Sequence, residues 1–126
     1  MNYSFGKEYK LCRKKLIDEI FTDTTSVKKF PFLMHYRLTE EPLEKHFQVV
    51  FSAPKRIFRN AVKRNRIKRV MREVFRHEKH ILENFLAQEG KYLSLFLVYT
   101  SSEELDQGIL SEKFRKLIHS LIDNLK

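Results

Sequence analysis

The sequence predicts an α/β fold, a two-layer α+β sandwich with helices on a small mixed sheet, in the order α-β-β-β-α-β-α. The chain has 126 residues and no Gly/Ser-rich linker, so we expect one domain over residues 1–126. Apolar residues make up 42% of the chain, which is typical of a globular protein. Short runs of β-branched and aromatic residues alternate with longer runs in which apolar residues recur every three or four positions.

A first helix is predicted over about residues 7–21, where two stripes recur at spacings of three and four. The apolar stripe consists of Tyr9, Cys12, Leu16 and Ile20. The second stripe, on a different side of the same helix, consists of Lys10, Lys14, Ile17 and Phe21. It begins basic and ends apolar, so its last two side chains are candidates for a surface role.

Three strands are predicted next, at 27–30, 32–38 and 47–53, because these runs are rich in β-branched and aromatic residues. Pro31 separates the first strand from the second, and Pro54 ends the third. The run 92–99 is the most strand-like in the chain, and we expect it to lie in the centre of the sheet.

Two further helices are predicted. The long one covers 61–87, with Asn60 as its N-cap and Gly90 just past its end. Its expected buried face consists of Ile67, Val70, Met71, Val74, Ile81, Leu82 and Phe85. The last helix opens at Gly108 to Ser111 and is amphipathic.

Positive charge is concentrated in one window. The net charge is +9, and residues 55–72 hold nine basic residues and no acidic one. The other 16 of the 25 basic residues match the 16 acidic ones elsewhere, so the whole excess lies in this window. A patch of one sign indicates a polyanionic partner, because a solvated face normally mixes both signs. A membrane-surface helix is disfavoured, because the apolar face of the long helix is needed to close the core.

Two rows of cations are predicted along the long helix, at spacings of three, four or seven. One row consists of Arg64, Lys68 and Arg72, and the other of Arg66, Arg69 and Arg76. Arginine predominates, which suits forked contacts to phosphate and stacking on bases. Asn65 adds an uncharged donor and acceptor between two arginines.

These residues resemble a known family. The run 60–73 (NAVKRNRIKRVMRE) closely resembles the Arg-Asn-Arg helix of the bacterial ribonuclease P protein. The run 52–56 (SAPKR) resembles the end of the preceding strand in that family, and 16–21 (LIDEIF) resembles its first helix. The element order and the length agree as well, so the resemblance covers nearly the whole chain. Two departures are Ile17, where the family commonly has an aromatic residue, and a longer segment at 56–60 without the usual glycine.

The resemblance implies a left-handed crossover around the Arg-Asn-Arg helix, an exception to the usual right-handed rule. It implies a protein subunit that binds the catalytic RNA and the 5′ leader of precursor tRNA, and so promotes removal of the leader. The implied contacts to the catalytic RNA are Lys63, Arg64, Asn65, Arg66 and Arg69. The implied leader-binding cleft is formed by Lys14, Ile17, Phe21, Lys55, Lys68 and Arg72.

No catalytic residue of the chain's own is predicted, since no Gly-rich phosphate loop and no Ser/His/Asp or Cys/His set is evident. Glu73, His77 and His80 share a region of the long helix, but a polar surface is favoured over a metal site. In the family the RNA and its Mg²⁺ ions carry out the hydrolysis, so Mg²⁺ is expected mainly on the RNA. The expected partners are therefore ribonuclease P RNA and precursor tRNA.

The single cysteine, Cys12, excludes an intrachain disulfide, and no stretch has the length and apolar character of a signal peptide or a membrane span. We therefore expect a cytoplasmic protein without a membrane or a disulfide partner. The main alternative function is a ribosomal or ribosome-assembly protein. A nuclease with its own chemistry and a DNA-binding regulator are further alternatives, and the latter normally needs a dimer or a helix-turn-helix pair.

Overall fold

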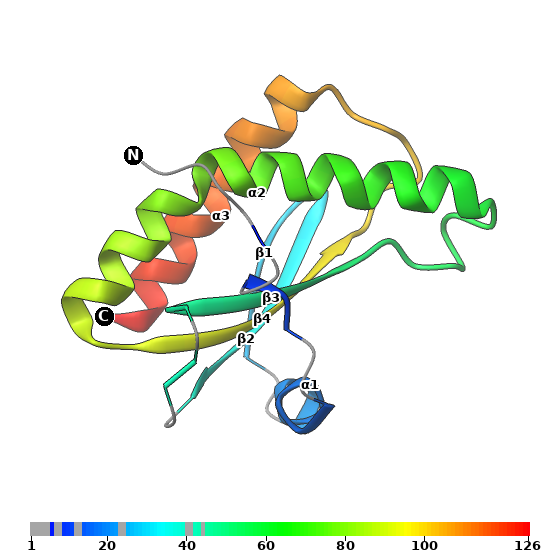
Figure 1. The fold of residues 1–126 in the computed structure, drawn as a ribbon. Helices are drawn as coiled ribbons and strands as arrows, with labels where there is room; N and C mark the ends of the chain where they lie inside the picture. Colours follow the sequence, from blue (N-terminus) through cyan, green and yellow to red (C-terminus); the bar gives the residue numbers. More distant parts are fainter. Residues whose placement is uncertain (1–5, 7–8, 12–13, 23–24, 40–41, 44) are drawn as a thin grey trace.

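A computed structural model describes residues 6, 9–11, 14–22, 25–39, 42–43 and 45–126, with the backbone alone at 21 and 22. The predicted order of elements is confirmed (Figure 1). The elements are α1 (Lys14–Thr22), β1 (Ser26–Lys29), β2 (Phe32–Thr39), β3 (Phe47–Ser52), α2 (Ala61–Glu89), β4 (Tyr92–Tyr99) and α3 (Gln107–Leu125). Within the described ranges, no helix combines the length and the apolar character that crossing a membrane requires.

The four strands form one mixed sheet in the order β1-β2-β4-β3. Strand β4 is central, as predicted: it pairs antiparallel with β2, with Phe32 opposite Tyr99, and parallel with β3, with Phe47 opposite Leu93. Because β3 and β4 are parallel neighbours, the chain must cross from one end of the sheet to the other between them, and α2 makes this crossover.

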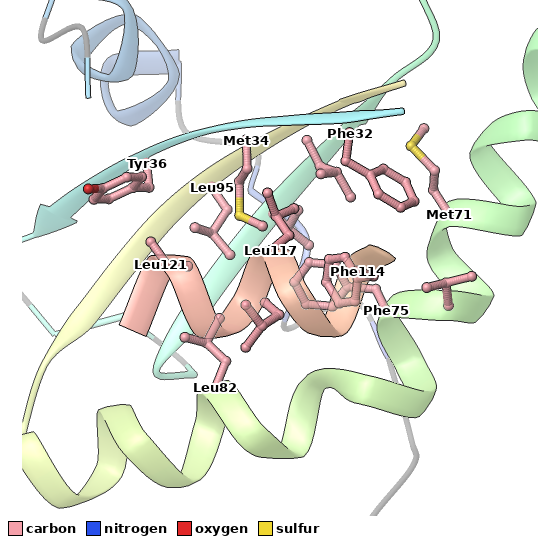
Figure 2. Packing of buried hydrophobic residues seen from close by; sticks show 14 of the residues in the cluster. Phe32, Met34, Tyr36, Met71, Phe75, Leu82, Leu95, Phe114, Leu117 and Leu121 are labelled. Carbon is pink, nitrogen blue, oxygen red and sulfur yellow. The ribbon is translucent and has the colours of Figure 1, made fainter. Parts of the chain in front are cut away.

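The main core lies between the sheet and the pair α2 and α3. Figure 2 shows side chains of β2 and β4 pointing toward those of the two helices. Phe75 of α2 and Phe114 of α3 contact each other with ring centroids 4.9 Å apart, and Phe32 of β2 lies 5.9 Å from Phe114. This aromatic cluster fixes how α2 sits on the sheet.

Helix α1 packs against β2 and β4, and Figure 1 shows it on the side of the sheet away from α2 and α3. Ile20 is fully buried there and does not belong to the main core. Arg37 of β2 holds the helix: its Nη1 donates to the Glu19 carbonyl at 3.0 Å, and its Nε lies 4.0 Å from the Glu19 carboxylate.

Helix α2 has the caps that its sequence predicted. The Asn60 side chain accepts hydrogen bonds from Val62 N and Lys63 N, and Gly90 adopts the left-handed conformation at φ 65°. Its 29 residues span about 43 Å, whereas an eight-residue strand spans about 26 Å. The helix therefore extends past the sheet, as Figure 1 shows, and its first buried residue is Ile67.

The predicted start of the first helix at about residue 7 is wrong. Helix α1 begins at Lys14, and Lys10 instead forms a parallel bridge with Val49 of β3. Leu11 N donates to Val49 O at 3.2 Å. Since β3 is an edge strand, its open backbone groups bind this extended segment in place of a further strand. Tyr9 is buried on the main core, and Cys12 lies outside the described residues.

The last helix begins slightly earlier than predicted. Helix α3 starts at Gln107, and Asp106 is its N-cap: the Asp106 carboxylate accepts a hydrogen bond from Gly108 N at 3.0 Å. A carboxylate at this position satisfies a free N–H of the first turn and interacts favourably with the helix dipole. Gly108 and Ser111 therefore lie inside the helix.

Candidate nucleic-acid interface

The nine basic residues of the 55–72 window are all exposed or half-buried in the structure, and we call them the basic surface. They are Lys55, Arg56, Arg59, Lys63, Arg64, Arg66, Lys68, Arg69 and Arg72. Three belong to the loop that precedes α2 and six to its first twelve residues. This loop and the first twelve residues of α2 together therefore carry the charge excess of the chain.

The loop before α2 is built on a turn at Pro54. The backbone N–H groups of Ile57 and Phe58 both donate to Pro54 O, at 3.0 and 2.9 Å. The Phe58 side chain is buried against Tyr99, with ring centroids 5.9 Å apart. Phe58 thus anchors the loop to the core, and the basic side chains on both sides of it stay exposed.

Arg64 links this loop to the helix. Its Nη1 donates to Phe58 O at 2.8 Å and to Arg59 O at 3.0 Å. These carbonyls leave the positive charge of the guanidinium in place, because they are uncharged acceptors. Arg64 therefore has a structural role in addition to the RNA contact that the resemblance implied.

Lys63 and Arg66 point toward residues 101–106, which connect β4 to α3. Lys63 Nζ donates to Ser102 O at 3.5 Å and lies 5.5 Å from the Phe58 ring centroid. Arg66 Nε donates to Glu104 Oε1 at 2.7 Å, and Arg66 Nη2 contacts the same oxygen. The hydrogen bond and the charge of Glu104 raise the pKa of Arg66 above its already high ordinary value.

The remaining basic side chains in this part of α2 are Lys68, Arg69 and Arg72, and the amide of Asn65 adds an uncharged group. Asn65, Arg69 and Arg72 are exposed, and Lys68 is half-buried. The guanidinium carbon of Arg72 lies 5.9 Å from the ring centroid of Phe51 on β3, within cation–π range. Arg72 thus places one end of the basic surface at edge strand β3.

The predicted leader-binding residues come from two separate parts of the fold. Lys14 is exposed and Ile17 half-buried on α1, which packs on β2 and β4. Arg72 contacts β3, Lys68 lies on α2, and Lys55 lies in the loop before it. The side chain of Phe21 lies outside the described residues. These residues surround one sheet, and their assembly into a single cleft stays a prediction.

A half-buried aromatic residue on the α1 side of the sheet was missed by the sequence reasoning. Phe96 of β4 lies beside His35 of β2, with ring centroids 6.4 Å apart. Its neighbours Leu95 and Leu97 are buried in the main core. Because strand side chains alternate between faces, the register of 92–99 already placed Phe96 on the opposite face.

The basic surface ends at Glu73. Its carboxylate accepts a hydrogen bond from Arg76 Nη2 at 2.5 Å and lies 3.3 Å from His77 Nε2. The Arg76 hydrogen bond lowers the pKa of Glu73. Among the described residues, no group of three or more His, Cys, Asp or Glu side chains is placed to hold a metal ion.

Comparison with known proteins decides the family. The sequence model of the family described as Ribonuclease P matches residues 5–122. The chain belongs to the ribonuclease P protein family. This assignment does not favour the ribosomal alternative.

Curated relatives agree with the ribonuclease P assignment. The chain is 28% identical over 123 residues to the ribonuclease P protein component of Porphyromonas gingivalis, covering 98% of this chain and 90% of that protein. It is 32% identical over 119 residues to that of Chlorobaculum tepidum, covering 89% and 76%.

Solved structures of ribonuclease P proteins share the fold. The protein from Thermotoga maritima superposes with a TM-score of 0.70 at 20% identity, covering 88% of this chain and 96% of that one. The Staphylococcus aureus protein gives a TM-score of 0.66 at 18% identity, with coverages of 90% and 94%. These likenesses confirm the predicted mixed α+β fold.

Proposed function

We propose that this chain is the protein subunit of ribonuclease P, which binds a catalytic RNA and the 5′ leader of precursor tRNA and promotes removal of the leader. One observation carries the proposal: in a member of this family, the charge excess is gathered on the first twelve residues of α2 and the loop before them, at the end of the helix that extends past the sheet. A projecting helix whose cations lie on its surface can follow the phosphates of a folded RNA.

The catalytic RNA is assigned to the first turns of α2. Lys63, Arg64 and Arg66 are held by neighbouring loops, whereas Asn65 and Arg69 are exposed. Guanidinium groups present forked donors to phosphate and flat faces to unstacked bases, and an amide adds a donor and an acceptor. We therefore assign phosphate and base contacts to this set.

We assign the 5′ leader to residues around the sheet, on α1, on α2 and in the loop before α2. Ile17 on α1 supplies apolar surface, with Lys14 at the start of the same helix, and the family resemblance adds Phe21 to this group. Lys68, Arg72 and Lys55 supply cations. Apolar or aromatic surfaces beside cations bind single strands with little sequence preference, because every base has a flat face and every linkage a phosphate. Phe96 is a further candidate for such a contact.

Hydrolysis is assigned to the RNA partner, with Mg²⁺ held mainly by the RNA and supplying an activated water. The chain's own share is to reduce the repulsion between two RNAs and to position the leader. We place this activity in the cytoplasm, where the two RNA partners are expected.

Reconstitution tests the proposal. Purified protein, bacterial ribonuclease P RNA and precursor tRNA are assayed at low Mg²⁺, with each component omitted in turn. We expect cleavage at the mature 5′ end that requires the RNA and is strongly increased by the protein. If the protein has no effect on the RNA, the proposal fails and the ribosomal alternative returns; if the protein cleaves alone, it is a nuclease in its own right.

A further inference from the structure

Residues 101–106, between β4 and α3, carry none of the functional residues that the sequence predicted, yet they contact the basic surface twice. Ser102 O accepts a hydrogen bond from Lys63 Nζ, and the Glu104 carboxylate binds Arg66. Two cations of the first turns of α2 are thus held by one short segment that lies 38 or more positions further along the chain.

The backbone on both sides of Glu104 is fixed by Tyr99. The Tyr99 hydroxyl donates to Glu103 O at 2.6 Å and accepts from Leu105 N at 3.2 Å. Tyr99 is fully buried, and its ring lies 6.1 Å from that of Phe32. The hydroxyl is therefore immobile, and it fixes the residues immediately before and after Glu104.

Two further hydrogen bonds stabilise the same segment. Glu103 N donates to Ser101 Oγ at 3.0 Å, and Asp106 caps α3 through Gly108 N. The carboxylate of Glu104 thus projects from a braced backbone, and it is a fixed acceptor for a flexible partner.

Arg66 is oriented by this acceptor. Its Nε and Nη2 both bind Glu104 Oε1, and its side chain remains 51% exposed. A guanidinium has five N–H donors in a rigid plane. With Nε and Nη2 on Glu104, the plane of the guanidinium is set, and the half-exposed side chain has further N–H donors for a ligand. An arginine fixed in this way loses less side-chain freedom when it binds a ligand than a free one does.

We propose that Glu104 is a positioning residue of the RNA interface, which holds the Arg66 guanidinium in one orientation for the catalytic RNA. The inference rests on the proposed function, since it requires Arg66 to contact that RNA. It adds Glu104 and Tyr99 as supports of the interface, although neither lies in the Arg-Asn-Arg helix.

Two opposing effects decide what loss of Glu104 does. Removing a carboxylate favours RNA binding, because it removes a negative charge next to phosphates. Freeing Arg66 disfavours binding, because a flexible side chain must then be ordered by the RNA. Ordering one such side chain changes an equilibrium by about two- to tenfold. At physiological salt we expect the charge effect to be smaller than the ordering effect, because the Glu104 carboxylate and the RNA phosphates are exposed to solvent and screened by ions.

The experiment measures the Kd for bacterial ribonuclease P RNA. Glu104→Ala is expected to weaken binding about twofold to tenfold. Glu103→Ala is the matched control: it removes the same charge one position away, and within the described residues its side chain makes no hydrogen bond or ion pair. Its Kd should be unchanged or slightly lower. Glu104→Gln keeps an acceptor oxygen and should recover part of the loss.

Two further variants make the result specific. In an Arg66→Ala background, Glu104→Ala should have no additional effect on the Kd, because the side chain that it positions is gone. Tyr99→Phe, which keeps the ring and removes the hydroxyl, should weaken binding in the same direction as Glu104→Ala. Thermal unfolding checks that each variant is folded at the assay temperature.

The outcomes separate the two proposals. If Glu104→Ala binds the RNA as Glu103→Ala does, or more tightly, Glu104 does not position Arg66 and the inference is overturned. If Arg66→Ala binds as the unmodified chain does, the proposed role of the Arg-Asn-Arg helix fails first. Loss of binding on Glu104→Ala that persists in the Arg66→Ala background would show an effect on the fold of the segment and would also overturn the inference.

Discussion

Lys79 Nζ lies 3.1 Å from Glu83 Oε1, one turn further along α2, at a place where only 1% of the Lys79 side chain is exposed. Tyr9 completes this group: its hydroxyl contacts Glu83 Oε1 at 2.5 Å and lies 3.3 Å from Lys79 Nζ. The ammonium also lies 4.9 Å from the centroid of the Tyr9 ring. A buried cation thus fastens the segment before α1 to the long helix.

We expect Lys79→Met to destabilise the fold by about 2 kcal/mol, less than the roughly 3–5 kcal/mol of a fully buried pair. We expect the smaller value because the Glu83 side chain is 29% exposed and therefore stays partly hydrated. Urea unfolding measures the change. The double variant Lys79→Met, Glu83→Gln should recover at least half of it, because no unpaired carboxylate remains. A double variant less stable than the single one would contradict this account.

Asn60→Ala should destabilise the protein by about 1 kcal/mol, because Val62 N and Lys63 N lose their acceptor. Asn60→Gly serves as the comparison, with an expected loss of a few tenths of a kcal/mol. Chemical denaturation measures both. Since the first turn carries Lys63, the Ala variant should also bind RNA more weakly than the Gly variant. Equal stability of the two variants would show that the cap does not stabilise α2.

The salt dependence of RNA binding tests the basic surface. If four or five of its nine cations contact phosphates, log K should fall against log salt with a slope of about −3 to −4. Arg69→Gln should make the slope less negative by about 0.7–0.9. Lys116→Gln on α3, also an exposed cation, should leave it unchanged. A slope near zero would show that the basic surface does not contact phosphates of the RNA.

Separate surfaces for the two RNAs predict separate mutational effects. Arg66→Ala should weaken binding of the catalytic RNA, whereas Phe21→Ala should chiefly weaken binding of leader-bearing precursor relative to mature tRNA. Filter binding with each RNA measures both effects. Equal losses for both variants on both RNAs would argue for one shared surface.

Alkaline pH should destabilise the fold through Tyr99. Burial is the main cause that raises the pKa of this hydroxyl in the folded state. The free energy of unfolding is therefore unaffected below the unfolded pKa of about 10 and falls as pH rises through the higher native value. Unfolding measured from pH 8.5 to 11 should show this loss, and Tyr99→Phe should not show it. At neutral pH, that variant should be less stable by about 1 kcal/mol, because Glu103 O and Leu105 N lose their partner.

Most of the fold was readable from local patterns. The strand-like run 92–99 and the caps Asn60 and Gly90 predicted β4 and α2 to within two residues. The charge window predicted a polyanion-binding surface, and all nine side chains are indeed accessible. The strand run, the helix caps and the charge window each depend on residues that are close in the sequence, so the sequence alone is enough to predict them.

In the segment before α1, local sequence patterns predict the wrong structure, a helix that starts at about residue 7. Tyr9 and Leu11 are both buried, and Lys10 between them is exposed and forms a bridge with β3. The spacing of Tyr9, Cys12, Leu16 and Ile20 instead predicts a helix here, whereas Lys10 pairs with β3 as an extended residue does. Only the open edge of β3, about 40 residues away, decides between the two, because it supplies the backbone partners for Lys10 and Leu11.

The sequence by itself determined the order of the elements, the family resemblance and the location of the charge excess, since periodicity, capping residues and composition are local properties. The tertiary structure decided how those charges are held. Arg64 binds two carbonyls, Arg66 binds Glu104, and Arg72 lies over Phe51. Arg66 and Glu104 are 38 positions apart, and they meet because the parallel pairing of β3 with β4 brings the segment after β4 back to the start of α2.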